Sequence, residues 1–190
     1  TSAKRVYSSS IEGWRLYPVA DGTVISQNAS DGVLGYSYKI DKNGVAQSLF
    51  SRPGLVVLPH PSAPAYLLSE STDGSVNLFA KSGASSSPLT LPVHTLAEKC
   101  AWLSGPSLVA YCAVPAGIAS KHFLDDWYRG IIHSADELWQ VDAGQGTAQM
   151  VFSPQNEASV SLDVKDPAID PTGNYIAFMN ANDLSLWSVR

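Results

Sequence analysis

The sequence has 190 residues, of which 45% are apolar and only 15% are charged, and its formal net charge is −5. This length is enough for one large domain or two small ones with a real hydrophobic core. The low charged fraction argues against a disordered chain, and the negative net charge argues against binding to nucleic-acid phosphates. Because a transmembrane helix needs about 20 consecutive apolar residues, which the sequence lacks, we expect no membrane-spanning segment.

The N-terminus begins Thr1-Ser2-Ala3, without an initiator Met. This start is consistent with a removed signal peptide, with a removed anchor that associated the protein with the cell envelope, or with a trimmed chain. Residues 4–9 then have the character of a short strand without an obvious neighbour. We expect this strand either to complete the last sheet, because an unpaired sheet edge is a liability, or to belong to a larger ring of which the chain is a fragment.

The rest of the chain consists of short apolar stretches that are rich in Val, Tyr, Trp, Leu and Ile. Gly, Pro, Asp and Asn separate these stretches at short intervals, with Asp-Gly or Asn-Gly pairs at 21–22, 31–32, 43–44 and 73–74. Such pairs suit the positive-φ positions of hairpin turns. The pattern is typical of an all-β protein with many short strands.

Internal repetition is the most informative feature of the sequence. The segment 44–50, GVAQSLF, resembles the segment 146–152, GTAQMVF, and residues 101–105 similarly match residues 168–173. Two further strand-like segments follow each member of the second pair. We therefore divide the chain into four units, each predicted to form a small antiparallel sheet: residues 11–51, 54–92, 95–153 and 158–190.

A single sheet of this kind is apolar on both faces, so stable burial requires each sheet to stack against its neighbours. The units repeat about every 40 residues, and they end in a strand that contains aromatic and aliphatic residues. This pattern favours a β-propeller of about four blades. A β-sandwich has strands at similar spacing and remains the alternative fold.

The last unit carries a family resemblance. Its segment 170–178, DPTGNYIAF, resembles the blade signature of WD40-like and TolB-type β-propellers. The segment 186–189, LWSV, resembles the strand that completes this signature. The resemblance covers two of the units well and the other two loosely, and it implies a β-propeller fold.

Cys100 and Cys112 flank two apolar segments that are joined by Ser-Gly-Pro-Ser. A hairpin here would place the two cysteines nearly opposite each other, where the Cα atoms of a non-hydrogen-bonded pair approach to about 4.5 Å. We predict a disulfide between them, and hence an oxidising compartment; two buried reduced thiols are the alternative. The spacing does not suit zinc, since the sequence has no CxxC pair.

The third unit contains an insertion, residues 114–135, between two predicted strands. Long loops on a rigid scaffold are often functional, and this one has a composition typical of binding hot spots. Its candidate binding residues are His122, Phe123, Asp126, Trp127, Tyr128, Arg129 and His133. Alternatively, the three aromatic residues cover the edge of a blade as a short helical turn. His122 and Asp126 would share a helix face, where they could hydrogen-bond or form half of a metal site.

The sequence lacks the motifs of serine hydrolases, zinc proteases and dinucleotide-binding enzymes, so no cofactor or metal is expected. We therefore predict a non-enzymatic, extracytoplasmic binding or scaffold module that recognises a protein, peptide or glycan through loops on one face. The alternative is part of a propeller hydrolase or lyase that is completed outside this chain, with Asp126, Arg129 and His133 as candidate catalytic residues. For His60, in a Pro-His-Pro sequence, we predict a structural role.

Overall fold

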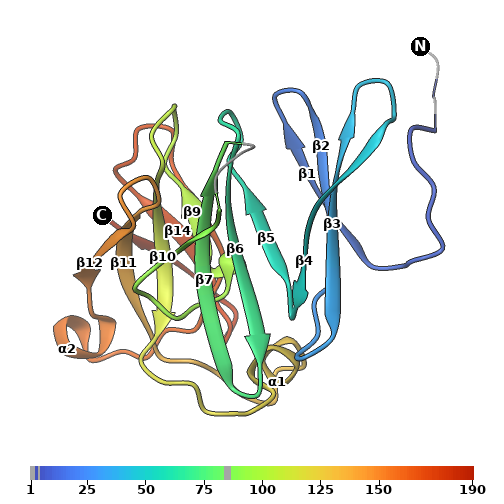
Figure 1. The fold of residues 1–190 in the computed structure, drawn as a ribbon. Helices are drawn as coiled ribbons and strands as arrows, with labels where there is room; N and C mark the ends of the chain where they lie inside the picture. Colours follow the sequence, from blue (N-terminus) through green and yellow to red (C-terminus); the bar gives the residue numbers. More distant parts are fainter. Residues whose placement is uncertain (1–2, 4, 84–86) are drawn as a thin grey trace.

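The computed structural model describes residues 3, 5–83 and 87–190, and it consists of four antiparallel sheets that follow one another in chain order (Figure 1). Blade 1 contains β1 (Trp14–Val19), β2 (Gly22–Gln27), β3 (Leu34–Asp41) and β4 (Ala46–Pro53). Blade 2 contains β5 (Val56–Pro59), β6 (Ala65–Thr72), β7 (Ser75–Ser82) and β8 (Leu89–Thr90). Blade 3 contains β9 (Cys100–Trp102), β10 (Val109–Pro115), β11 (Asp136–Asp142) and β12 (Thr147–Phe152). Blade 4 contains β13 (Val164–Ile169), β14 (Ile176–Asn180) and β15 (Ser185–Val189).

Within every blade, consecutive strands are neighbours, so each sheet is a simple up-and-down meander. The four sheets are arranged as the blades of a β-propeller, which confirms the predicted fold class and excludes the sandwich. The first strand of each blade, β1, β5, β9 or β13, contributes residues to one shared pocket, which is described below.

Apolar side chains fill the space between successive blades, as the stacking argument requires. Phe50 of blade 1 packs with Leu55, Val57 and Leu68 of the blade 2 region. A larger cluster joins blades 2 and 3, and a third joins blades 3 and 4 through residues that include Leu138 and Phe178. Each blade therefore shields a face of the next one from water.

The passage from blade 1 to blade 2 requires a glycine. Gly54 has a φ of +57°, which favours a residue without a side chain. A Cβ atom at this position would lie 2.4 Å from the carbonyl oxygen of Ser71 in blade 2. The close backbone approach at Gly54 thus helps to bring the two blades together.

The predicted insertion contains the short helix α1 (Phe123–Tyr128), which connects three blades. Phe123 and Leu124 are completely buried in the core of blades 2 and 3. The backbone N–H of Asp125 donates to the Asp31 carboxylate at 3.1 Å, and Ser30 donates to the Asp125 carboxylate at 3.1 Å, so the helix also reaches blade 1. The insertion therefore crosses beneath the propeller instead of covering one blade edge.

Two other helical segments are short: the 3-10 helix η1 (Ala97–Lys99), before β9, and α2 (Pro154–Ala158), after β12. None of the helices in the described part of the chain has the length and apolar character needed to cross a lipid bilayer.

The N-terminal segment packs on blade 1. Lys4 lies outside the described residues, and residues 5–9 form no strand. The ring of Tyr7 stands edge-on to that of Trp14 in β1, with centroids 6.3 Å apart. Strand β15 is hydrogen-bonded to β14, and blade 4 has three strands in the described residues. The described part of residues 4–9 does not add a fourth strand to this blade, so the predicted completion of blade 4 is not observed there.

Cys100 of β9 and Cys112 of β10 are direct cross-strand partners and form the predicted disulfide. Their Cα atoms lie 4.0 Å apart. The disulfide fixes the innermost strand of blade 3, next to the residues described below.

Candidate functional site

A pocket of about 860 Å³ lies at the centre of the propeller, and we call it the axial pocket. The first strands of all four blades contribute to its wall, together with η1 and the end of the insertion. Its lining residues are Arg15, Leu16, Tyr17, Leu58, Glu98, Cys100, Trp127, Tyr128, Arg129, Gly130, His133, Lys165, Asp166, Pro167, Ala181 and Leu184.

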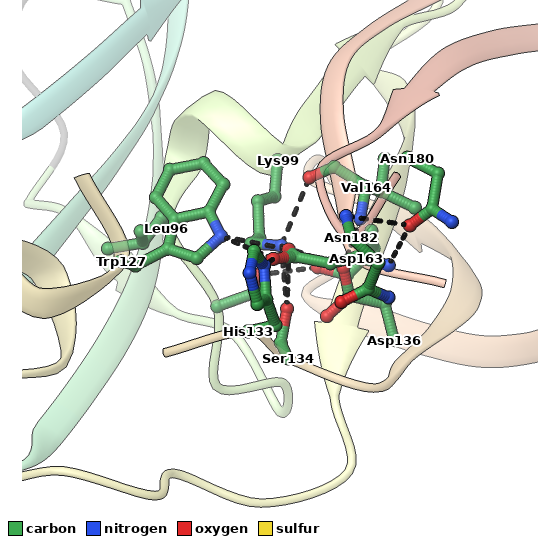
Figure 2. A network of polar contacts seen from close by, with 12 residues as sticks. Leu96, Lys99, Trp127, His133, Ser134, Asp136, Asp163, Val164, Asn180 and Asn182 are labelled. Atoms are coloured by element: carbon green, nitrogen blue, oxygen red, sulfur yellow. Dashed lines mark hydrogen bonds and ion pairs between the residues drawn. The ribbon is translucent and has the colours of Figure 1, made fainter. Parts of the chain in front are cut away.

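Behind the wall of the axial pocket lies a buried ion cluster built around Lys99 (Figure 2). The Lys99 ammonium donates to Asp136 Oδ2 at 2.7 Å and to Asp163 Oδ1 at 2.8 Å. It also contacts Ser134 Oγ at 2.9 Å and the Val164 carbonyl oxygen at 3.0 Å. Lys99 and both carboxylates are completely buried. A buried ammonium is stable only with such partners, so the cluster fixes η1 against blades 3 and 4.

The two carboxyl groups of the cluster differ in acidity. Burial dominates at Asp136 and raises the pKa of its carboxyl, despite the contact with Lys99. At Asp163 burial acts in the same direction, but Lys99, Ser134 and Trp127 outweigh it and lower the pKa of the carboxyl. Asp163 is therefore the member of the pair that holds the negative charge most firmly.

Asp163 also orients two side chains that line the axial pocket. The Trp127 indole N–H donates to both Asp163 oxygens, at 2.8 and 3.0 Å. The Nδ1 atom of His133 lies 3.0 Å from Asp163 Oδ2. Since a carboxylate can only accept, we assign the ring proton to Nδ1, which leaves Nε2 as the free nitrogen. The His133 side chain is 40% exposed, so the pocket contains an oriented imidazole held by a buried carboxylate.

A second polar cluster joins blade 1 to the insertion. Arg15 of β1 forms an ion pair with Glu98, and its second guanidinium nitrogen donates to the Tyr128 hydroxyl at 3.0 Å. The Tyr128 hydroxyl in turn donates to the other oxygen of Glu98. Burial and the Glu98 charge raise the pKa of Tyr128, so the phenol stays protonated and remains a donor. Arg15 and Glu98 thus largely neutralise each other.

Three charged lining residues have no side-chain polar partner among the described residues. Arg129 and Lys165 are exposed cations without an ion pair, and the carboxylate of Asp166 is likewise unpaired. Leu16 and Leu184 also line the pocket, and they are 68% and 73% exposed. The wall thus offers both charged and apolar groups to a ligand.

The seven candidate binding residues of the insertion do not all lie at one site in the structure. Trp127, Tyr128, Arg129 and His133 line the axial pocket. Phe123 is buried in the core and anchors α1 there, so in this arrangement it cannot contact a partner.

The other two candidates, His122 and Asp126, do not line the axial pocket. The Asp126 carboxylate instead accepts a hydrogen bond from the Ser120 hydroxyl at 2.5 Å. Of the three candidate catalytic residues, Arg129 and His133 therefore share the pocket, and Asp126 lies apart from them.

The sequence did not point to most of the charged groups at the site, namely Arg15, Glu98, Lys99, Asp136, Asp163, Lys165 and Asp166. A weak signal was present in Leu162-Asp163-Val164, where a single carboxylate stands between apolar residues. Buried charges of this kind are rare unless they are paired.

His60 lies outside the axial pocket and has the structural role expected for it. Its Nδ1 atom accepts the backbone N–H groups of Ser62 and Ala63, at 3.1 and 2.9 Å. Its Nε2 atom lies 3.2 Å from the carbonyl oxygen of Ser107 in the neighbouring blade. The neutral ring with its proton on Nε2 satisfies all three contacts.

Comparison with solved structures identifies a similar fold. A protein of Agrobacterium tumefaciens described as a TolB matches with a TM-score of 0.61 at 11% sequence identity, over 97% of this chain and 60% of that one. The present chain thus spans 60% of the length of that protein. A variant of the apocarotenoid oxygenase of Synechocystis matches with a TM-score of 0.46 at 9% identity, over 94% of this chain and 49% of that one. No family model and no curated protein matches the sequence. The TolB likeness shows a β-propeller fold, and at this identity it shows the fold alone.

Proposed function

We propose that the protein is a β-propeller binding module that takes part of a partner molecule into the axial pocket. The observation that carries this proposal is the convergence of four first strands and the insertion on one pocket of about 860 Å³. This volume falls in the range of about 300 to 1,000 Å³ that is typical of ligand sites. Propeller blades supply the rigid frame, and the insertion supplies the variable contacts.

The contacting groups are held in place before a partner arrives. Phe123 and Leu124 anchor α1 in the core, and Asp163 fixes both Trp127 and His133. Such preorganisation reduces the entropy that is lost on binding. The exposed Leu16 adds apolar area of the kind that a partner can cover.

We also propose that the protein works in an oxidising, extracytoplasmic compartment. The Cys100–Cys112 disulfide supports this location, because disulfides persist mainly outside the reducing cytosol.

Selection of random displayed peptides on the immobilised protein, followed by binding to two leucine variants, tests the proposal. Leu16 and Leu186 are both strand residues and are 68% and 74% exposed, but only Leu16 lines the axial pocket. We expect selected peptides to lose most of their affinity for Leu16→Ser and to bind Leu186→Ser normally. Failure to select any peptide, or equal affinity for both variants, would contradict binding of peptides in the pocket.

A second candidate function rests on the His133–Asp163 pair. The Nδ1 of this imidazole is held by a buried carboxylate, and its Nε2 lies in a pocket without a partner among the described residues; this is the arrangement of a general base. This supports the alternative of a hydrolase or lyase whose site is completed outside the chain. A screen with chromogenic esters and glycosides and with uronate polymers tests it: turnover that His133→Asn abolishes supports an enzyme. Turnover that survives the substitution, or none at all, argues against it.

A further inference from the structure

We infer that the occupant of the axial pocket is an extended peptide bearing side-chain carboxylates, and that Arg129 and Lys165 are the groups that contact these carboxylates. This inference rests on the proposed function and narrows it to one class of partner.

The charges of the pocket wall favour an anionic ligand. Three cationic side chains line it, against the carboxylates of Glu98 and Asp166. Glu98 is already engaged by Arg15 and Tyr128, with both of its oxygens accepting hydrogen bonds. The cations left without a partner among the described residues outnumber the remaining carboxylate, although the whole chain has a net charge of −5. The lining side chains thus include one more cation than carboxylates, and the two unpaired cations are the groups that can select a ligand by charge.

The backbone around the pocket favours a peptide. Strands β1 and β13 are the first strands of their blades, and in the described part of the chain each is hydrogen-bonded to a neighbouring strand on one side only. The pairing of β13 with β14 is interrupted between Lys165 and Ala168. Asp166 and Pro167, which line the pocket, lie in this interruption. The unpaired edges of β1 and β13 offer C=O groups and, except at Pro18 and Pro167, N–H groups. An extended peptide can pair with such an edge, as in β-strand addition.

The aromatic residues of the pocket argue against a glycan as the carboxylate carrier. Sugar rings bind well to a free aromatic face. Trp127 is buried, and its ring packs against the Lys99 ammonium, 4.5 Å from the centroid. The ring of Tyr128 packs against the Arg15 guanidinium at 5.3 Å. Two of the three aromatic side chains that line the pocket are therefore already committed to protein cations, and the third is the half-buried Tyr17.

Fluorescence anisotropy with labelled Ser-Gly peptides tests the inference. Three peptides of equal length carry glutamate, glutamine or lysine at the same positions, and an oligogalacturonate supplies the same carboxylate on a glycan. We expect the glutamate peptide to bind most tightly and to lose affinity as salt increases. Arg129→Gln and Lys165→Gln should each weaken binding about twofold to fivefold, the range for exposed ion pairs. Asp166→Asn should strengthen it, because it removes the unpaired negative charge.

The outcomes separate this inference from the proposed function. If the glutamine peptide binds as tightly as the glutamate peptide and Leu16→Ser weakens both, the pocket binds peptides and the charge inference is wrong. If the oligogalacturonate binds and the glutamate peptide does not, the carboxylate carrier is a glycan and the peptide inference is wrong. If no probe binds, while the protein is folded by circular dichroism, both the inference and peptide binding in the pocket are contradicted.

Discussion

The imidazole of His133 and the carboxylate of Asp163 lie 3.0 Å apart, between Nδ1 and Oδ2, and join the surface of the axial pocket to the buried ion cluster. His133 belongs to the insertion of blade 3, and Asp163 immediately precedes the first strand of blade 4. Because Asp163 also binds Lys99, one carboxylate connects η1, the insertion and blade 4. The position of the pocket wall thus depends on a buried group that does not itself line the pocket.

Removing the ammonium of the cluster should strongly destabilise the protein. Lys99→Met leaves Asp136 and Asp163 buried side by side without a cation. Breaking a buried ion pair in this way typically costs about 3–5 kcal/mol. Urea unfolding measures the loss, and the exposed Lys165→Met is the matched control with little expected change. An unfolding free energy of Lys99→Met within error of the wild type would contradict the described cluster.

Trp127 should stabilise the fold through its indole N–H in addition to the packing of its ring. Trp127→Phe keeps most of the apolar volume but removes the hydrogen bonds to the Asp163 carboxylate. A hydrogen bond to a charged group contributes about 1.5–3 kcal/mol, against about 0.5–1.5 kcal/mol for a neutral pair. Trp187→Phe is the control, because Trp187 donates to the neutral Ser185 hydroxyl. Chemical denaturation of both variants should rank Trp127→Phe as the less stable; the reverse order would count against the assignment.

Reduction of the Cys100–Cys112 disulfide should lower stability by about 2–4 kcal/mol, the usual effect of a native disulfide. The measurement is the urea midpoint with and without a reductant. The double variant Cys100→Ala/Cys112→Ala should unfold at the midpoint of the reduced wild type and should not respond to reductant. A wild-type midpoint that does not respond to reductant would show that the two thiols are free.

His60 should make stability depend on pH. Burial lowers the pKa of His60 below its ordinary value of 6.5, and the hydrogen bond with Ser107 opposes this only in part. The unfolded chain therefore binds the proton first as the pH falls, so the stabilising effect is present above about pH 6.5 and is lost below it. Unfolding free energies at pH 7 and pH 5 test this. His60→Asn, which keeps an acceptor for the Ser62 and Ala63 N–H groups, should show a weaker pH dependence; an unchanged dependence would contradict the argument.

The fold could be predicted because local sequence and packing agree in this protein. The repeated segments 44–50 and 146–152 begin at turn glycines and continue into β4 and β12, the fourth strands of blades 1 and 3. The matched residues 101–102 and 168–169 lie in the first strands of blades 3 and 4. The Cys100–Cys112 pairing followed from the same hairpin argument. The repeat length of the blades and the residue types of the turns can be read from local sequence, so a single sequence was enough to predict the blades.

The site could be predicted only in part. The insertion stood out by length and composition, but its path beneath the propeller depends on contacts with Ser30 and Asp31 in a distant blade. Lys99 and Asp163 are 64 positions apart, and no local pattern connects them. Charged partners that meet only through blade stacking leave little trace in a single sequence.

Hydrogen–deuterium exchange tests most directly whether the axial pocket is the binding site, with the glutamate peptide or a displayed peptide from the selection as ligand. We expect the ligand to slow exchange in β1, in β13 and at the end of the insertion around Arg129, because these segments line the pocket. Slower exchange confined to outer strands such as β4 and β12, with no change in β1 or β13, would show that the partner binds elsewhere and would contradict binding in the axial pocket.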